Sequence, residues 1–291
     1  MTAQTAIFEP VPAHARHLLF DLNPSAYPRA VLQALAAACD GRSAMLGVGV
    51  TIAQALGVAV AGLRGFPLLP DARPAIPATQ HALWLWLRGD EPGDLLRRGH
   101  ALQHLIAPAF TLAQAIDSFR HQDSRDLTGY EDGTENPKDA AAVEAAVMQG
   151  QGTGLDGSSF AAVQQWLHDF PTFDAMPRAE QDACLGRCRD DNEELADAPA
   201  SAHVKRTAQE DFDPEAFVVR RSMPWAAGAD AGLVFLAFGK SFDAFEAQLR
   251  RMTGHDDGIS DALFRFTRPL TSGYYWCPPM TGNAVDLSAL G

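Results

Sequence analysis

Asp132 lies in the most distinctive short string of this sequence, GYEDGTENP at residues 129–137. A carboxylate held in such a string can accept and return a proton during a reaction. The Gly, Asn and Pro residues around it favour turns with unusual backbone angles. Asp-Gly alone would indicate an ordinary surface turn, because this dipeptide is common in turns. The nine residues together are far more specific, so Asp132 is a candidate proton-transfer residue.

Two further stretches carry groups that could bind a ligand. His203 follows ADAPASA, residues 196–202, and precedes Val, Lys and Arg. Its imidazole could ligate a metal, although a single histidine is more often structural. Arg220 and Arg221 lie in the apolar run FVVRRSMPW, and a strand would place them on opposite faces. The one that points inward must bind an anion or pair with an acid.

Two other pairs of candidate metal ligands are weaker. His100 and His104 lie four apart on a predicted helix, but no HExxH frame or third ligand accompanies them. Cys184 and Cys188 are also four apart and lack further ligands at a suitable spacing. We therefore expect solvated or packed side chains at both pairs, and reduced thiols throughout.

Hydrophobic patterns predict the elements that must position these residues. Short apolar or alternating runs indicate strands, and apolar residues three and four apart indicate helices. The first half is predicted to contain, in order, strand 16–24, helix 28–41, strand 44–51, strand 82–89, helix 90–107 and strand 110–119. The second half is predicted to contain strand 158–170, helix 177–195, strand 217–225, strand 232–239, helix 241–254 and strand 271–279.

Both halves therefore share the β-α-β-β-α-β order of the ferredoxin-like arrangement. This order predicts a duplicated α+β architecture, with two antiparallel sheets and peripheral helices. We expect an N-terminal half at 1–125, an irregular linker at 126–157 that carries Asp132, and a C-terminal half at 158–291 that carries His203.

Composition limits the partners. The 291 residues carry 23 Lys and Arg against 36 Asp and Glu, a net charge of −13. Nucleic-acid binding needs clustered cations, so we expect no nucleic-acid partner. The sequence has no apolar run of about 18 residues and no secretory signal pattern at its start, so we expect a cytoplasmic protein with no membrane partner. The cations near His203 and Arg220 would still suit a small anion.

The candidate stretches together resemble one family. GYEDGTENP resembles the GxxDG(T)xNP motif of the dye-decolourising peroxidases, which are haem enzymes built of two ferredoxin-like halves. ADAPASAHVKR resembles the family's segment with the proximal haem-ligand histidine, and VVRRSMPW resembles the segment with the distal arginine. FLAFGKSFDAFEAQLRRMTG and LFRFTRPLTSGYYWCPP resemble its C-terminal half. The resemblance spans residues 129–279 and implies a fold of the dimeric α+β barrel type, like that of the intracellular bacterial members.

The resemblance also implies roles for individual residues. Asp132 and Arg220 match the distal catalytic pair, and His203 matches the proximal ligand of the haem iron. The family places a carboxylate behind that histidine, for which Asp261 is one candidate, in competition with Asp256 and Asp257. The further haem contacts that we expect are those of Arg206, as a propionate partner, and of Arg220, Ser222, Gly133 and Thr134.

A haem peroxidase is the function that this resemblance implies. It would hold one haem b per subunit, reduce H₂O₂, and oxidise dyes, phenolics or similar organic electron donors. A homo-oligomer, dimer or higher, is also implied, and free strand edges would favour it. The alternative is a haem-handling protein, such as a haem carrier or an iron-release factor, with incidental peroxidase activity. A haem-free ferredoxin-like binding module is a third interpretation.

Overall fold

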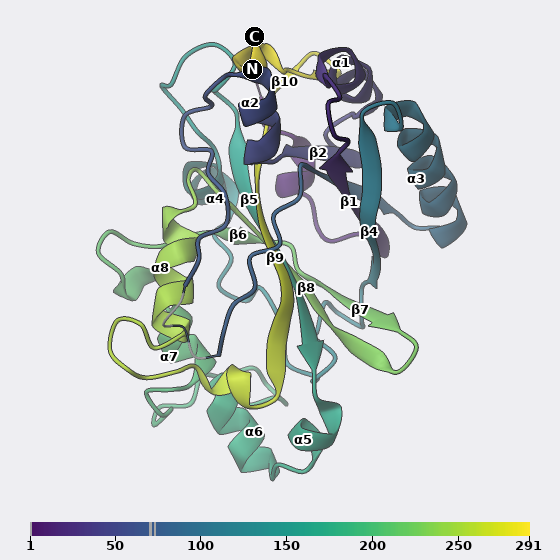
Figure 1. Ribbon diagram of the computed structural model, residues 1–291. Coiled ribbons are helices and arrows are strands. Elements are labelled where there is room, and N and C mark those ends of the chain that lie inside the picture. The colour runs from purple at the N-terminus through teal and green to yellow at the C-terminus, as the bar shows by residue number, and fades with distance from the viewer. Residues whose placement is uncertain (1, 70–71, 73) are drawn as a thin grey trace.

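The central strands form because their alternating side chains are buried on both faces. β3 (Leu83–Gly89) has the sequence LWLWLRG, in which the leucines join one apolar cluster and the two tryptophans join another. Apolar residues on both faces are typical of a strand packed between two layers. The computed structural model describes residues 2–69, 72 and 74–291, and Figure 1 shows its elements.

In the part of the chain that the structure describes, the first half contains four strands and three α-helices. In chain order these are β1 (His14–Leu22), α1 (Arg29–Ala38), β2 (Ala44–Val48), α2 (Val50–Leu56), β3, α3 (Pro92–Ile106) and β4 (Phe110–Phe119). The second half begins after α4 (Asp139–Ala146). It contains β5 (Ser159–His168), α5 (Phe170–Asp174), α6 (Arg178–Leu185), α7 (His203–Thr207), β6 (Val219–Arg220), β7 (Met223–Ala227), β8 (Asp230–Gly239), α8 (Asp243–Met252) and β9 (Thr267–Cys277). A short hairpin of β10 (Met280–Thr281) and β11 (Ala284–Val285) follows.

The strands join into a closed ring. Each half supplies four antiparallel strands, in the orders β2-β3-β1-β4 and β9-β5-β8-β7. Two pairings, each of a single residue pair, join the halves: Val48 with Trp276, and Ser118 with Trp225. The duplicated ferredoxin-like α+β class predicted from the sequence is confirmed, and its two sheets share both borders. The boundaries of the two halves stay a proposal.

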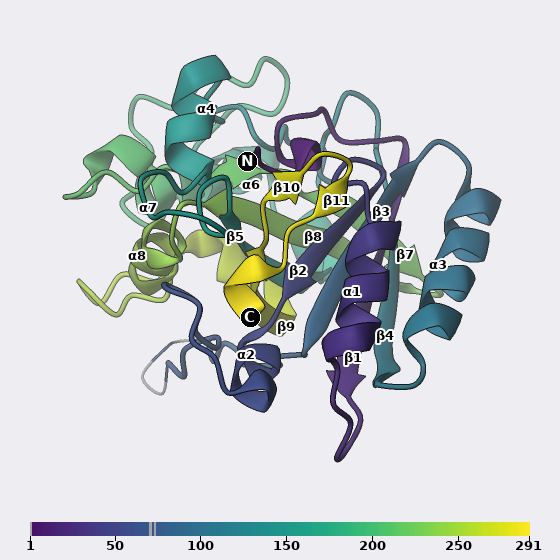
Figure 2. The ribbon, with the colours of Figure 1, turned by 90° about the horizontal axis from the view of Figure 1, so that it is seen from above.

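Two apolar clusters fill the inside and the outside of this ring. The inner cluster contains Trp84, Trp86, Phe238 and Tyr275, each at most 1% exposed. The outer cluster lies between the strands and the helices, which Figure 2 shows at the periphery of the molecule. Burial of this many large side chains is the main source of stability in such a fold. No helix of the described residues is long and apolar enough to cross a membrane.

Gln4 links β2 to the segment after β9, at the border where these two strands share a single residue pair. Its side chain is 1% exposed, and its Nε2 donates hydrogen bonds to the carbonyl oxygens of Leu46 (2.9 Å) and Pro278 (3.0 Å). Its Oε1 accepts a hydrogen bond from the Leu46 N–H (2.9 Å). A side-chain amide therefore supplies the hydrogen bonds that a neighbouring strand would otherwise make.

Replacing Gln4 with leucine should lower the free energy of unfolding by about 3 kcal/mol, because three buried backbone groups lose their partner. Urea unfolding followed by tryptophan fluorescence measures the change. Gln54→Leu, at an exposed position on α2, is the control and should change stability little. Equal stability of the two variants would contradict this role of Gln4.

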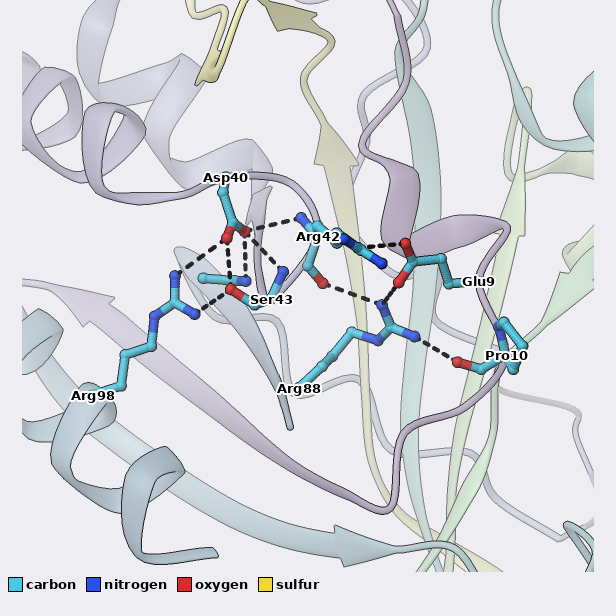
Figure 3. A network of polar contacts seen from close by, with 8 residues as sticks. Glu9, Pro10, Asp40, Arg42, Ser43, Arg88 and Arg98 are labelled. Carbon is cyan, nitrogen blue, oxygen red and sulfur yellow. Dashed lines mark hydrogen bonds and ion pairs between the residues drawn. The ribbon is translucent and has the colours of Figure 1, made fainter. Parts of the chain in front are cut away.

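A second polar network fastens the N-terminal segment to the end of the first sheet (Figure 3). Arg88 donates hydrogen bonds to Glu9 and to the carbonyl oxygens of Arg42 and Pro10. Asp40 accepts hydrogen bonds from the side chain of Ser43 and from backbone N–H groups of residues 42–44. Burial alone would raise the pKa of Asp40, but these hydrogen bonds outweigh it and lower the pKa to about 2.

Several elements differ from the sequence prediction. The helix expected at 177–195 ends at Leu185, because Gly186 has a positive φ and caps it. Glycine is required there, since a Cβ would lie 2.3 Å from the side chain of Val204. The strand expected at 217–225 is broken between β6 and β7, which lie in tandem along β8. The linker expected to be irregular contains α4, whose alanine-rich sequence lacks apolar periodicity.

Candidate functional site

A cavity of about 480 Å³ lies between the second half of the molecule and the loop that precedes α4. Strands β5, β6, β8 and β9 supply one wall, helices α7 and α8 supply another, and the loop of residues 128–135 supplies a third. Five of the residues predicted from the sequence line it: Asp132, Gly133, Thr134, His203 and Arg220. The fold therefore brings together groups from three segments that are far apart in the chain.

His203 is the first residue of α7 and is oriented by a buried carboxylate. Its Nδ1 lies 2.7 Å from Oδ2 of Asp261, whose side chain is fully buried. A carboxylate only accepts, so Nδ1 carries the hydrogen and Nε2 is left as the nitrogen that can ligate a metal. The Asp261 segment is itself fixed, because the N–H of Ala262 donates to the carbonyl of Ser201 (2.8 Å). The structure thus selects Asp261, while Asp256 pairs with Arg250 and Asp257 with Arg206.

Asp132 lies in the loop between β4 and α4. Among the described residues its carboxylate has no hydrogen-bond partner, although it lines the cavity. Gly133 follows with φ +77°, and a Cβ there would lie 2.8 Å from Nδ2 of Asn136. Glycine is therefore required for the loop to turn without displacing Asn136. Asp132 is a carboxylate that can take up a proton from a bound molecule.

Arg220 lies on β6, and among the described residues it is one of three cationic side chains that line the cavity, with Arg187 and Lys205. Its Nε is buried and has no hydrogen-bond partner within the described residues. A buried guanidinium nitrogen without a partner is costly unless an anion or another acceptor binds there. The Arg220 backbone is held by Asn136, which bonds both its N–H (2.7 Å) and its carbonyl (3.0 Å).

Three other predicted positions lie differently. Arg206 is 4% exposed and forms a two-pronged pair with Asp257, so the structure does not bring it to the cavity lining. Ser222 is also buried outside the lining, where its hydroxyl accepts from the N–H of Leu236 (3.4 Å). Arg221 points away from the cavity, as strand alternation predicts, and burial lowers its pKa to about 10, with a smaller effect of nearby Arg88.

Sequence reasoning missed other polar residues of the lining. His168 on β5 lies 3.0 Å from Asp126 and 2.7 Å from Thr267, and all three line the cavity. Burial alone would raise the pKa of Asp126, but the contact with His168 and hydrogen bonds from Thr128 hold it below its usual value. Gln209 also lines the cavity and is 3% exposed. Nothing in the sequence marks these residues, because each depends on a partner distant in the chain.

A comparison with protein-family models matches residues 123–282 to the C-terminal domain of the Dyp-type peroxidases. This match covers more than half of the chain. The chain belongs to the dye-decolourising peroxidase family. The matched region of this family member contains Asp132, His203, Arg220 and Asp261, so the sequence resemblance to the family is confirmed.

Similarity to curated dye-decolourising peroxidases supports the assignment. The relative from Mycolicibacterium paratuberculosis is 31% identical over 75% of the chain, and that from Rhodococcus erythropolis is 30% identical over 72% of it. The alignments cover 63% and 68% of those relatives' own lengths. The chain thus spans about two thirds of the length of the curated family members that it matches.

Solved structures share the fold of this dye-decolourising peroxidase family member over nearly the whole chain. A dye-decolorizing protein from V. cholerae has a TM-score of 0.84 at 26% identity, with 94% of this chain and 96% of that chain covered. A variant of DypB from Rhodococcus jostii RHA1, solved in complex with heme, has a TM-score of 0.83 at 25% identity and covers 94% and 95%.

Proposed function

We propose that this protein is a haem-dependent peroxidase that reduces H₂O₂ and oxidises dyes, phenolics or similar one-electron donors. The observation that carries the proposal is one cavity that joins the His203–Asp261 pair to Asp132 and Arg220. Family membership and the heme complex of a structural neighbour support it.

The residues present fit one haem b per subunit. His203 offers one ring nitrogen to the cavity, and the cavity walls include apolar side chains: Leu233, Phe235, Leu249 and Met252. The unpartnered Nε of Arg220 gives the cavity a buried donor. A neutral imidazole backed by a carboxylate is a strong axial ligand for iron. When bound, haem would supply the redox centre at which peroxide is reduced.

Two residues of this chain would handle the peroxide. Breaking the O–O bond requires a proton to leave one oxygen and a proton to reach the oxygen that departs. Asp132 is the carboxylate placed to move that proton. Arg220 would stabilise the negative charge that develops as the bond breaks. Asp261 would hold His203 in one tautomer throughout.

The test is the spectrum and reactivity of the purified protein with haem. We expect a Soret band of histidine-bound haem and H₂O₂-dependent oxidation of a phenol such as guaiacol. Stopped-flow mixing with H₂O₂ should show a rapid spectral change if the protein is a peroxidase. A second experiment adds excess apomyoglobin, to which a haem carrier would lose its haem. Fully loaded protein that fails to oxidise any donor with H₂O₂ would overturn the proposal.

Asp261→Ala should weaken haem binding by about 10–100-fold, the usual cost of losing the partner of a metal-bound histidine. Titration of the haem-free protein with haem measures the affinity of each variant for haem. Asp256→Ala is the control, because that exposed carboxylate pairs with Arg250. Equal affinities of the two variants would show that the 2.7 Å contact with His203 has no such role.

We also propose a homo-oligomer, dimer or higher. Its support is family resemblance alone. Free strand edges do not support it, because the closed ring leaves few of them among the described residues. Such an assembly would therefore have to use a surface other than the strand edges considered from the sequence. The cytoplasmic location stays a prediction.

A further inference from the structure

Among the described residues, the strand segment that carries Arg220 has a neighbouring strand on one edge only. β6 pairs with β8 through Val219–Phe238 and Arg220–Ala237, and the N–H of Arg221 continues this edge by bonding to Leu236. The backbone groups of Val218 and Arg220 point to the other edge. A buried edge without partners would leave polar groups unsatisfied, which costs free energy.

Two side-chain amides occupy that second edge. Oε1 of Gln209 accepts from the N–H of Val218 (2.9 Å), and Oδ1 of Asn136 accepts from the N–H of Arg220 (2.7 Å). Nδ2 of Asn136 donates to the Arg220 carbonyl (3.0 Å), which also accepts from Nη1 of Arg221 (2.8 Å). We call Asn136 and Gln209 the amide clasp, because together they take the place of a strand.

The amide clasp also ties together the segments that carry the other site residues. Asn136 lies four residues after Asp132, and Gln209 lies six residues after His203. Nε2 of Gln209 donates to the carbonyl of Glu135 (2.9 Å), which joins the His203 segment directly to the Asp132 loop. The Asp132 loop, the Arg220 strand and the His203 segment thus form a closed triangle of hydrogen bonds.

The chain uses the same device at two places away from the cavity. Gln4 bonds the backbone of Leu46, and Gln80 bonds both the N–H (2.9 Å) and the carbonyl (2.8 Å) of Tyr274. Neither glutamine lines the cavity. These amides supply matched controls with nearly identical bonds and no site residue in their segment.

We propose that Asn136 and Gln209 are positioning residues that set Asp132, Arg220 and His203 relative to one another. The inference rests on the proposed function. It assigns a role to Asn136, which lies in the family motif, and to Gln209, which lies outside it. Gly133 supports it, because a larger residue there would push Asn136 from Arg220. The backbone of Arg220 and the loop that carries Asp132 are therefore held by neutral amides.

The test compares three leucine variants in the haem-loaded protein: Asn136→Leu, Gln209→Leu and Gln80→Leu. All three should lose stability in urea, because each removes the acceptor of a backbone N–H: that of Arg220, Val218 or Tyr274. Only the first two should slow the reaction with H₂O₂, by about 10-fold or more, as misplacement near the reacting groups does. Asn136→Asp keeps the acceptor for the Arg220 N–H and should recover part of the rate.

Hydrogen cyanide association gives a second measurement, since this ligand must also surrender a proton inside the cavity. It should slow in parallel with the H₂O₂ reaction in the two clasp variants and not in Gln80→Leu. Unchanged rates in both clasp variants would overturn the positioning role. If the unmodified loaded protein itself did not react with H₂O₂, the proposed function would fail instead, and cyanide association would still test the clasp.

Discussion

Replacing His203 with alanine is expected to abolish stable haem binding and, with it, all peroxide-dependent oxidation. The loss should exceed the ~10–100-fold cost of removing a partner residue, because the iron ligand itself is gone. His203 is half-buried at the start of α7, so replacing its ring with a methyl group leaves a space beside the helix. The substitution leaves no group of α7 itself without a hydrogen-bond partner. The buried carboxylate of Asp261 does lose its partner, so some stability is lost as well.

Titration with haem measures this loss, and added imidazole serves as a chemical rescue. Imidazole should enter the space, restore the Soret spectrum and recover part of the activity. His255→Ala, at an exposed position, is the control and should bind haem like the unmodified protein. A His203→Ala protein with an unchanged spectrum would show that another residue holds the iron.

Replacing Arg220 with leucine should slow the reaction with H₂O₂ by about 10²–10³-fold while haem binding persists, because the variant loses charge stabilisation in a buried site. The apolar side chain also removes a guanidinium nitrogen that has no partner in the described residues, so stability should change little. The backbone bonds from Asn136 to residue 220 do not involve this side chain and should remain.

Stopped-flow mixing of the loaded variant with H₂O₂ measures the rate. Arg268→Leu is the matched control, because Arg268 is an exposed arginine on β9 outside the cavity. A rate for Arg220→Leu within a few-fold of that control would exclude charge stabilisation by Arg220.

The sequence was most informative where a hydrophobic pattern or a motif lies within one short stretch of the chain. The alternation of LWLWLRG predicts β3, and the turn residues of GYEDGTENP predict the loop that holds Asp132. The order of elements likewise predicts two ferredoxin-like halves. It does not predict that the sheets join at both borders, because Val48–Trp276 and Ser118–Trp225 are contacts between halves.

Site residues were predictable to the extent that a motif contains them. Asp132, His203 and Arg220 were placed from their local strings, and all three line one cavity. Arg206 was expected there from its position one turn after His203, but Asp257 holds its guanidinium elsewhere. Choosing Asp261 among three aspartates required the fold, since only its carboxylate reaches the ring of His203.

The closed ring of strands has a consequence for the order in which the chain folds during synthesis. Among the described residues, β9 follows the other long strands in the chain and is therefore synthesised after them, and it pairs with both β5 and β2. Thr2, near the N-terminus, pairs with Met280, and Nε2 of Gln4 donates to the carbonyl of Pro278. Until Tyr275 emerges, Trp84 lacks one of the aromatic side chains that pack against it, so the nascent chain holds an unclosed barrel whose inner apolar face is partly exposed.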